Sequence, residues 1–189
     1  MSHNSNLGWD ILIRFSHWLV ASLFLANAFF IEPDAFFSDY INWAALPEFI
    51  ADASPHEWAG WTILGMLVIR ILWGLTFAKG PNRLKDFVPS LVDAKEHLGH
   101  LKTRQKQTKI GHNSFGAIAV YFMWTGLAFI IFTGWAQDTD WGFDNNLDQW
   151  HQWGVDAMTI FVCIHVMAVI STSLLLKQNL ISAMIKNQN

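Results

Sequence analysis

The sequence predicts an all-α integral membrane protein, a four-helix bundle with both termini in the cytoplasm. Three observations support this fold class: the composition, four long apolar runs and the placement of the basic residues. Of the 189 residues, 52% are hydrophobic and only 14% are charged, which is a very apolar balance for a soluble domain of this length. We expect the whole chain, residues 1–189, to form one transmembrane domain.

Four apolar runs predict spanning helices, at about residues 11–31, 56–78, 113–135 and 151–176. Each run is close to the ~20 residues that a helix needs to cross a bilayer. Buried helices of a soluble protein are the alternative, but four runs of this length in so short a chain disfavour it. Tryptophans stand near the ends of the runs, as in an aromatic belt at the membrane surfaces. They include Trp9, Trp18, Trp58, Trp61, Trp73, Trp135, Trp141, Trp150 and Trp153.

The basic residues predict the orientation of these helices. Eight of the twelve lie between the second and third runs, whereas segments 32–57 and 136–152 contain no Lys or Arg. Short loops rich in Lys and Arg stay in the cytoplasm. The middle connection and both termini are therefore expected inside, and the two other loops outside. The eight residues are Lys79, Arg83, Lys85, Lys95, Lys102, Arg104, Lys106 and Lys109.

The outer loops are acidic, and two interpretations of their carboxylates stay open. They are either solvated loop residues or a docking face that attracts a basic soluble partner through its electric field. No nucleic-acid partner is expected. The carboxylates are Glu32, Asp34, Asp39, Glu48, Asp52, Glu57, Asp138, Asp140, Asp144, Asp148 and Asp156.

Two histidines of the fourth run, His151 and His165, are 14 residues apart. At about 100° per residue they share one helix face, and they lie about 21 Å apart along the axis. That separation covers most of the hydrocarbon core of a bilayer, which is about 30 Å thick. The helix can therefore carry one metal ligand near each membrane surface, each of which needs a partner from another helix.

Partners of matching depth are His17, about 9 Å into the first helix from the cytoplasmic end, and His56 at the outer end of the second. A single membrane histidine is more often a hydrogen-bonding core residue. Four histidines that divide two and two predict metal ligation instead. Imidazole binds haem iron, zinc and copper, and two stacked sites with no carboxylate at the inner depth fit bis-histidine haem best. The single cysteine, Cys163, excludes a covalent c-type haem.

Three further residues are candidates for contacts with a cofactor. Arg70 is 14 residues after His56, so it shares the face of that histidine at the inner depth. It either pairs with a haem propionate or extends to the inner headgroups, and Arg14 poses the same choice. Gly60, one turn after His56, either leaves room for a flat macrocycle or allows close helix packing.

Four short segments resemble the bacterial cytochrome b561 and nickel-iron-hydrogenase cytochrome b family. The resemblance covers nearly the whole chain, and the fourth-helix pair His151 and His165 matches too. One departure is visible, because the usual Gly-His-Asn-Pro-Leu-Gly of the family lacks its proline here. The segments are 9–18 (WDILIRFSHW), 56–65 (HEWAGWTILG), 70–74 (RILWG) and 111–116 (GHNSFG).

The resemblance implies a bundle with two non-covalent b haems in the bacterial inner membrane. His17 and His165 would ligate the inner haem, and His56 and His151 the outer one. Family members pass electrons between a periplasmic partner, often a c-type cytochrome or a hydrogenase, and the quinone pool. The acidic outer loops favour a basic cytochrome as the partner.

For the quinone we expect a site in the inner half, with Arg14, His112 and Asn113 as hydrogen-bonding groups. Helix capping and headgroup contact are the alternative roles of these residues. No catalytic side chain is predicted.

Two rival functions stay open. Some family relatives oxidise superoxide and reduce ubiquinone, which would make the chain an enzyme, but outer loops without Lys or Arg would not attract that anion. The other rival is a structural membrane anchor whose histidines only link helices by hydrogen bonds.

Overall fold

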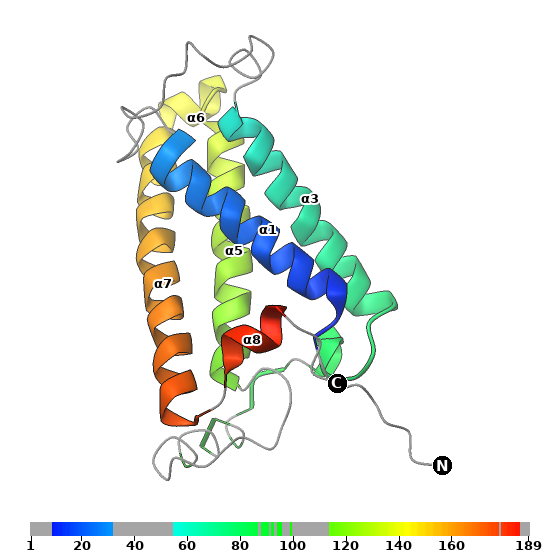
Figure 1. Ribbon diagram of the computed structural model, residues 1–189. Coiled ribbons are helices and arrows are strands. Elements are labelled where there is room, and N and C mark those ends of the chain that lie inside the picture. The colour runs from blue at the N-terminus through cyan, green and yellow to red at the C-terminus, as the bar shows by residue number, and fades with distance from the viewer. Residues whose placement is uncertain are drawn as a thin grey trace, which may run out of the picture. The chain divides into compact units, whose positions relative to one another are not determined.

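The computed structural model describes residues 9–31, 55–86, 88–90, 92, 94–95, 99, 114–177 and 179–185 (Figure 1). Every regular element within these ranges is helical, so the predicted all-α class is confirmed. The long helices are α1 (Ile11–Ala26), α3 (Pro55–Thr76), α5 (Ser114–Ala136) and α7 (Leu147–Leu175). The short ones are α6 (Asp140–Asp144) and α8 (Leu180–Ile185), with a π-helical turn η1 (Asn27–Ile31) and 3₁₀ turns η4 (Gly80–Asn82) and η5 (Leu84–Asp86).

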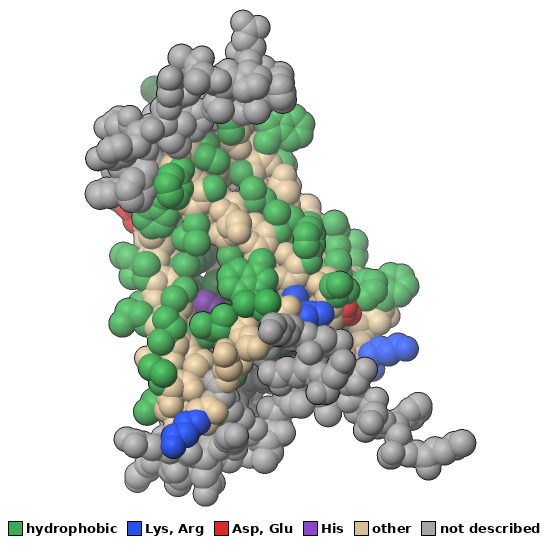
Figure 2. Space-filling view, in the orientation of Figure 1, with side chains coloured by type: hydrophobic (Ala, Val, Ile, Leu, Met, Phe, Trp, Pro, Cys, Tyr) green, Lys and Arg blue, Asp and Glu red, His purple; other side chains and the backbone are tan. Residues whose placement is uncertain are grey.

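Among the described residues, four helices are long and apolar enough to cross a membrane, as the sequence predicts. They are Ile11–Ile31, which joins α1 to η1, and α3, α5 and α7. Only 6–28% of the most apolar window of each span is buried inside the protein. Figure 2 shows hydrophobic side chains exposed along the helices. Exposed apolar surface of this extent is the pattern of helices that face lipid.

The helix α7 begins at Leu147, four residues before the apolar run that predicted it. The turn before it contains Asn146 in a left-handed conformation, with φ 53°, which asparagine tolerates better than most residues. Thr139 caps the preceding α6 by accepting a hydrogen bond of 3.0 Å from the Gly142 amide. His151 therefore lies within the first turns of α7 rather than at its first residue. The helix restricts the backbone conformation of His151.

The described chain forms two compact units, and each is described by itself. Unit 1 takes the described residues within Met1–Arg14, Arg70–Thr125 and Ile160–Asn189. Unit 2 takes those within Phe15–Ile69 and Gly126–Thr159. Each long helix therefore contributes one part to each unit.

In unit 2 the helices α5 and α7 approach closely at two glycines. A Cβ added at Gly126 would overlap the methyl group of Met158, and one added at Gly154 would lie 3.1 Å from Ile130 and 3.3 Å from Phe129. Small residues of this kind allow membrane helices to pack closely. The close approach brings the backbone of α5 within reach of side chains on α7.

In unit 1, hydrogen bonds from side chains hold the helix ends. Asp10 caps α1 by accepting from the Leu12 amide at 3.3 Å, and its other oxygen accepts from the Trp73 indole at 2.9 Å. The Ser114 hydroxyl, at the first residue of α5, accepts from the Ser90 amide at 2.9 Å and donates to the Ser90 carbonyl at 2.7 Å. These contacts fasten the start of α1 to α3 and the start of α5 to the segment before it.

Candidate functional site

Unit 2 brings together His56 and His151, the pair predicted to serve one site. His56 is the second residue of α3, directly after a proline at its first position, where proline starts helices well. The two partly buried imidazoles have ring centroids 6.0 Å apart, with ring planes at 78°. Two helices from distant parts of the sequence thus present one imidazole each to the same place.

The spacing of these two rings fits ligation of one metal ion between them. An imidazole nitrogen binds a metal at about 2.0–2.1 Å, so two imidazoles that hold the same ion would have centroids about 6 Å apart or less. Within the described part of the chain, no cluster of three or more His, Cys, Asp or Glu could hold a metal. The two imidazoles that the described residues bring together suit an iron whose other ligands would belong to a macrocycle.

The helix α5 orients the His151 ring. The Nδ1 atom lies 2.9 Å from the Ile130 carbonyl oxygen and 3.3 Å from the Thr133 hydroxyl oxygen. A carbonyl can only accept, so Nδ1 carries the proton in the Ile130 bond and the lone pair of the ring is on Nε2. That is the tautomer in which Nε2 can bind a metal.

Gly134 lies directly against the same ring. A Cβ added there would be 2.9 Å from Cε1 and 3.1 Å from Nδ1 of His151. Any side chain at this position would push the imidazole away from α5. Thr133 and Gly134 could not be identified from the sequence, because hydroxyl side chains and glycines are common in apolar membrane helices.

Asn27 supports the other histidine of the pair. Its Nδ2 atom donates to the His56 carbonyl oxygen at 3.2 Å, and the residue is 9% exposed. Asn27 begins the π-helical turn η1, and such turns are frequent at functional sites. Asn27 was not among the residues predicted from the sequence, although an amide inside an apolar run is a signal that could have identified it.

Gly60, one turn after His56, has open space beside it. Among the described residues, no atom other than those of its chain neighbours and of the backbone of its own helix lies within 4 Å of a Cβ built at this glycine. Both interpretations of Gly60, room for a macrocycle and close helix packing, stay predictions. The open space matches the room that a macrocycle next to His56 needs.

In unit 1, Arg70 is buried, with 7% of its surface exposed. Its Nη2 donates to the Asn82 carbonyl at 3.3 Å, and the guanidinium carbon lies 5.7 Å from the centre of the Trp124 ring, within cation–π range. Its Nη1 is buried beside Gly74 and has no hydrogen-bond partner among the described residues. A guanidinium so enclosed is not one that extends freely toward headgroups.

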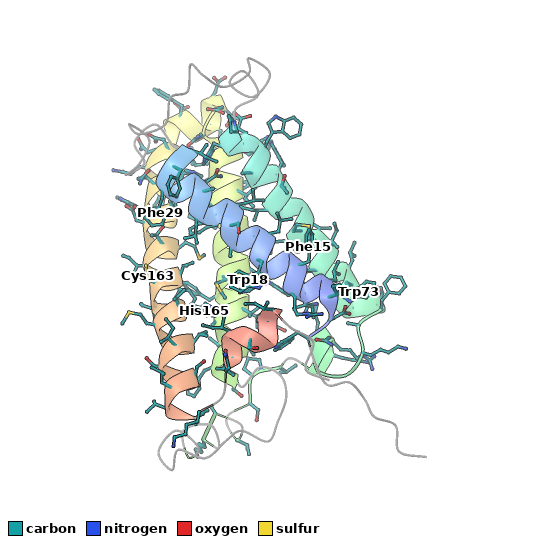
Figure 3. All side chains as sticks on the ribbon, in the orientation of Figure 1. Phe15, Trp18, Phe29, Trp73, Cys163 and His165 are labelled. Atoms are coloured by element: carbon teal, nitrogen blue, oxygen red, sulfur yellow. The ribbon has the colours of Figure 1, made fainter. Side chains whose placement is uncertain are left out.

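The other two predicted ligands, His17 and His165, belong to different units. His17, in unit 2, has its ring 5.2 Å from that of Trp18, at 90°. His165, in unit 1, is partly buried and lies on the opposite side of α7 from the exposed Cys163 (Figure 3). The helix α7 is continuous from His151 to His165, so these two histidines are about 21 Å apart along its axis.

Arg14 has a contact that the sequence did not predict. Its Nη1 donates to the Ile185 carbonyl in α8 at 3.2 Å, across 171 positions of sequence. This bond links the start of α1 to the end of the described chain. His112 and Asn113, the other predicted quinone contacts, lie outside the described residues.

The model of one protein family, the prokaryotic cytochrome b561 family, matches residues 8–187 of the chain. The chain is also similar to a curated protein of Bradyrhizobium diazoefficiens named probable Ni/Fe-hydrogenase B-type cytochrome subunit. The two are 24% identical over 216 residues, which cover 95% of this chain and 84% of the relative. No solved structure matches the chain.

Proposed function

This chain belongs to the prokaryotic cytochrome b561 family, and we propose that it passes electrons across the bacterial inner membrane through two haems b. The family and the four apolar helices make it a multi-pass membrane cytochrome of the b type, with a role in electron transfer. The proposal concerns the number of haems, their ligands, the quinone and the partner.

The outer haem is assigned to His56 and His151, and the geometry of this pair carries the proposal. The two imidazoles, with centroids 6.0 Å apart, would hold one haem iron, and the bond from Nδ1 of His151 to Ile130 sets the tautomer that this requires. Haem iron supplies a one-electron acceptor and donor. The chain supplies the ligands, their orientation and an apolar surrounding.

The inner haem is assigned to His17 and His165, from sequence spacing. His165 is 14 residues after His151 on the continuous α7, on nearly the same face of that helix. His17 is six residues after the start of α1 at Ile11, about 9 Å along its axis. Both positions correspond to the cytoplasmic half of the spans under the proposed orientation.

Arg70 is proposed to bind a propionate of the inner haem. On α3 it is 14 residues after His56, which separates it from the outer ligand by about 21 Å along the helix axis. Its Nη1 is buried and has no hydrogen-bond partner among the described residues, and arginine binds carboxylates through two parallel hydrogen bonds. For Arg14, the bond to Ile185 supports a structural role in holding α8.

The proposed outside partner is a basic c-type cytochrome or a hydrogenase subunit, and the proposed inside partner is quinone. The name of the Bradyrhizobium relative supports a hydrogenase subunit as the partner. The exposed negative charge of unit 2 supports a basic protein as the partner. All the described carboxylates predicted for the outer side are exposed, and they would repel superoxide. They are Glu57, Asp138, Asp140, Asp144, Asp148 and Asp156.

Haem stoichiometry in purified variants tests the proposal. We expect about two haems b per chain in the unchanged protein, one in His151→Ala and one in His17→Ala, with different haems lost in the two variants. Cys163→Ala, at an exposed position of the same helix, is the control and should keep both. If His151→Ala retains both haems, the ligand assignment is wrong. A protein without any b-type reduced-minus-oxidised spectrum would instead favour the structural anchor.

Isolation of the protein with its partners from native membranes tests the electron path. Copurification of a c-type cytochrome or a hydrogenase subunit supports the proposed partner class. Rapid haem reduction by superoxide in the purified protein alone would favour the rival enzyme activity.

A further inference from the structure

We propose that Thr133 and Gly134 of α5 are positioning residues for His151, and that they set how strongly this imidazole holds the outer haem. This inference rests on the proposed function, in which His151 would hold the outer haem. It adds two residues from a helix that supplies no ligand. Both act through the His151 ring rather than on the cofactor.

The first observation is the set of oxygen atoms around Nδ1 of His151. The ring N–H points to the Ile130 carbonyl at 2.9 Å, with the Thr133 hydroxyl oxygen also near at 3.3 Å. The hydroxyl in turn lies 3.0 Å from the carbonyls of Phe129 and Ile130, to which it can donate its proton. The hydroxyl oxygen thus keeps a lone pair toward the ring.

The second observation is the absence of a side chain at position 134. The carbonyl of Ile130 lies one turn before Gly134, and the side chain of a residue four positions later normally shields such a carbonyl from outside the helix. At Gly134 an added Cβ would be 2.9 Å from Cε1 of His151, closer than real Cβ contacts. The glycine at position 134 therefore lets the His151 imidazole reach the Ile130 carbonyl, although this carbonyl lies within α5.

These contacts are suited to tuning a ligand. A second hydrogen bond on a metal-binding imidazole fixes the tautomer and the ring orientation, and it raises the basicity of the ligating nitrogen. Thr133 is 2% exposed, so water does not replace its hydroxyl if it is removed. These contacts could not be predicted from the sequence, because they form between α5 and α7 rather than along one helix.

The test compares four variants of the full-length protein: Thr133→Val, Thr133→Ser, Gly134→Ala and Thr125→Val. Valine matches threonine in shape but lacks the hydroxyl, and serine keeps the hydroxyl. Thr125 is a matched control, because its hydroxyl also bonds to carbonyls of its own helix, those of Tyr121 and Phe122, but at an exposed position. Haem content, the reduced-minus-oxidised spectrum and the midpoint potential of each haem are measured.

We expect Thr133→Val to weaken retention of the outer haem about tenfold, as is typical when an outer-shell partner of a metal ligand is removed. The potential of the outer haem should become more positive, because a less basic imidazole stabilises oxidised iron less. Thr133→Ser and Thr125→Val should behave as the unchanged protein. Gly134→Ala should lose the outer haem, and the retained inner haem shows that the variant has folded.

The outcomes separate this inference from the proposed function. If His151→Ala removes one haem but Thr133→Val and Gly134→Ala leave the outer haem and its potential unchanged, the positioning role is wrong and the ligand assignment stands. If Thr125→Val produces the same loss as Thr133→Val, the effect is a general one of helix hydroxyls and the inference also fails. If His151→Ala removes no haem, the proposed function itself fails.

Discussion

Replacing Arg70 by methionine asks whether this guanidinium binds an acidic group of the inner haem. Arg70 is 7% exposed, donates to the Asn82 carbonyl at 3.3 Å and lies 5.7 Å from the Trp124 ring centre. Methionine keeps much of the apolar length of the side chain and removes its charge. Arg70→Lys keeps the charge but not the planar group that forms two parallel bonds.

The folding stability of Arg70→Met should change little. The bond to Asn82 contributes about 1.5–3 kcal/mol as a bond from a charged donor, and the contact with Trp124 adds about 0.5–2 kcal/mol. Burial of the charge opposes these gains by several kcal/mol, about as much as the contacts supply. The free energy lost with the contacts to Asn82 and Trp124 is therefore nearly offset by the free energy gained when the charge is no longer buried.

Haem binding should change much more. Removing one member of a buried, hydrogen-bonded charge pair costs about 2–5 kcal/mol, and at about 1.4 kcal/mol per tenfold this weakens binding by about 30-fold or more. We expect Arg70→Met to lose the inner haem during purification and keep the outer one, with Arg70→Lys intermediate. Haem content per chain and redox titration of the retained haem are the measurements.

Lys79→Met is the control for the removal of one positive charge, because Lys79 is exposed beside the same end of α3. It should retain both haems. If Arg70→Met also retains both, with unchanged potentials, then Arg70 contacts no propionate and serves only to join α3 to the segment at Asn82.

Two further predictions concern the support and packing of unit 2. Asn27→Leu removes the 3.2 Å bond to the His56 carbonyl, about 1 kcal/mol, so the outer haem should dissociate at a lower temperature in an absorbance melt; an unchanged melting profile would show that the bond does not hold α3. Gly126→Ala adds a Cβ that overlaps the Met158 methyl and should destabilise the fold by about 1–3 kcal/mol in thermal unfolding. The double variant Gly126→Ala/Met158→Ala should recover part of this loss, and a loss without recovery would show that the overlap is not its cause.

The sequence predicted the helices well because membrane spans are encoded along the chain. Each span is a long apolar run, and its length is set by the thickness of the bilayer rather than by contacts with distant residues. The start of α7 was placed four residues late. Leu147 to Trp150 are not an apolar stretch, and the end of the preceding turn depends on the backbone conformation of Asn146.

The proximity of His56 and His151 could be expected from the sequence, because depth in a membrane follows from position along a helix. Their role as ligands of one haem stays a prediction. The contacts of Arg14 with Ile185 and of His151 with Ile130 could not be expected in this way. They depend on the distance between two helix surfaces and on the direction of single side chains. Asn27 is an intermediate case, since its polarity within an apolar run is visible in the sequence but its partner is not.

In unit 2 the proposed tasks of binding and orienting the outer haem fall on different helices. The helices α3 and α7 carry the two imidazoles, while α5 supplies the Ile130 carbonyl, the Thr133 hydroxyl and the gap at Gly134. Substitution of a histidine removes the ligand, and its effect cannot show how the ring was held. Substitutions in α5 keep both imidazoles and alter only their setting. Weaker retention of the outer haem and a more positive potential are therefore expected from Thr133→Val. Loss of the outer haem is expected from Gly134→Ala, because its added Cβ would displace the ring, and from substitution of His56 or His151, because the ligand itself is removed.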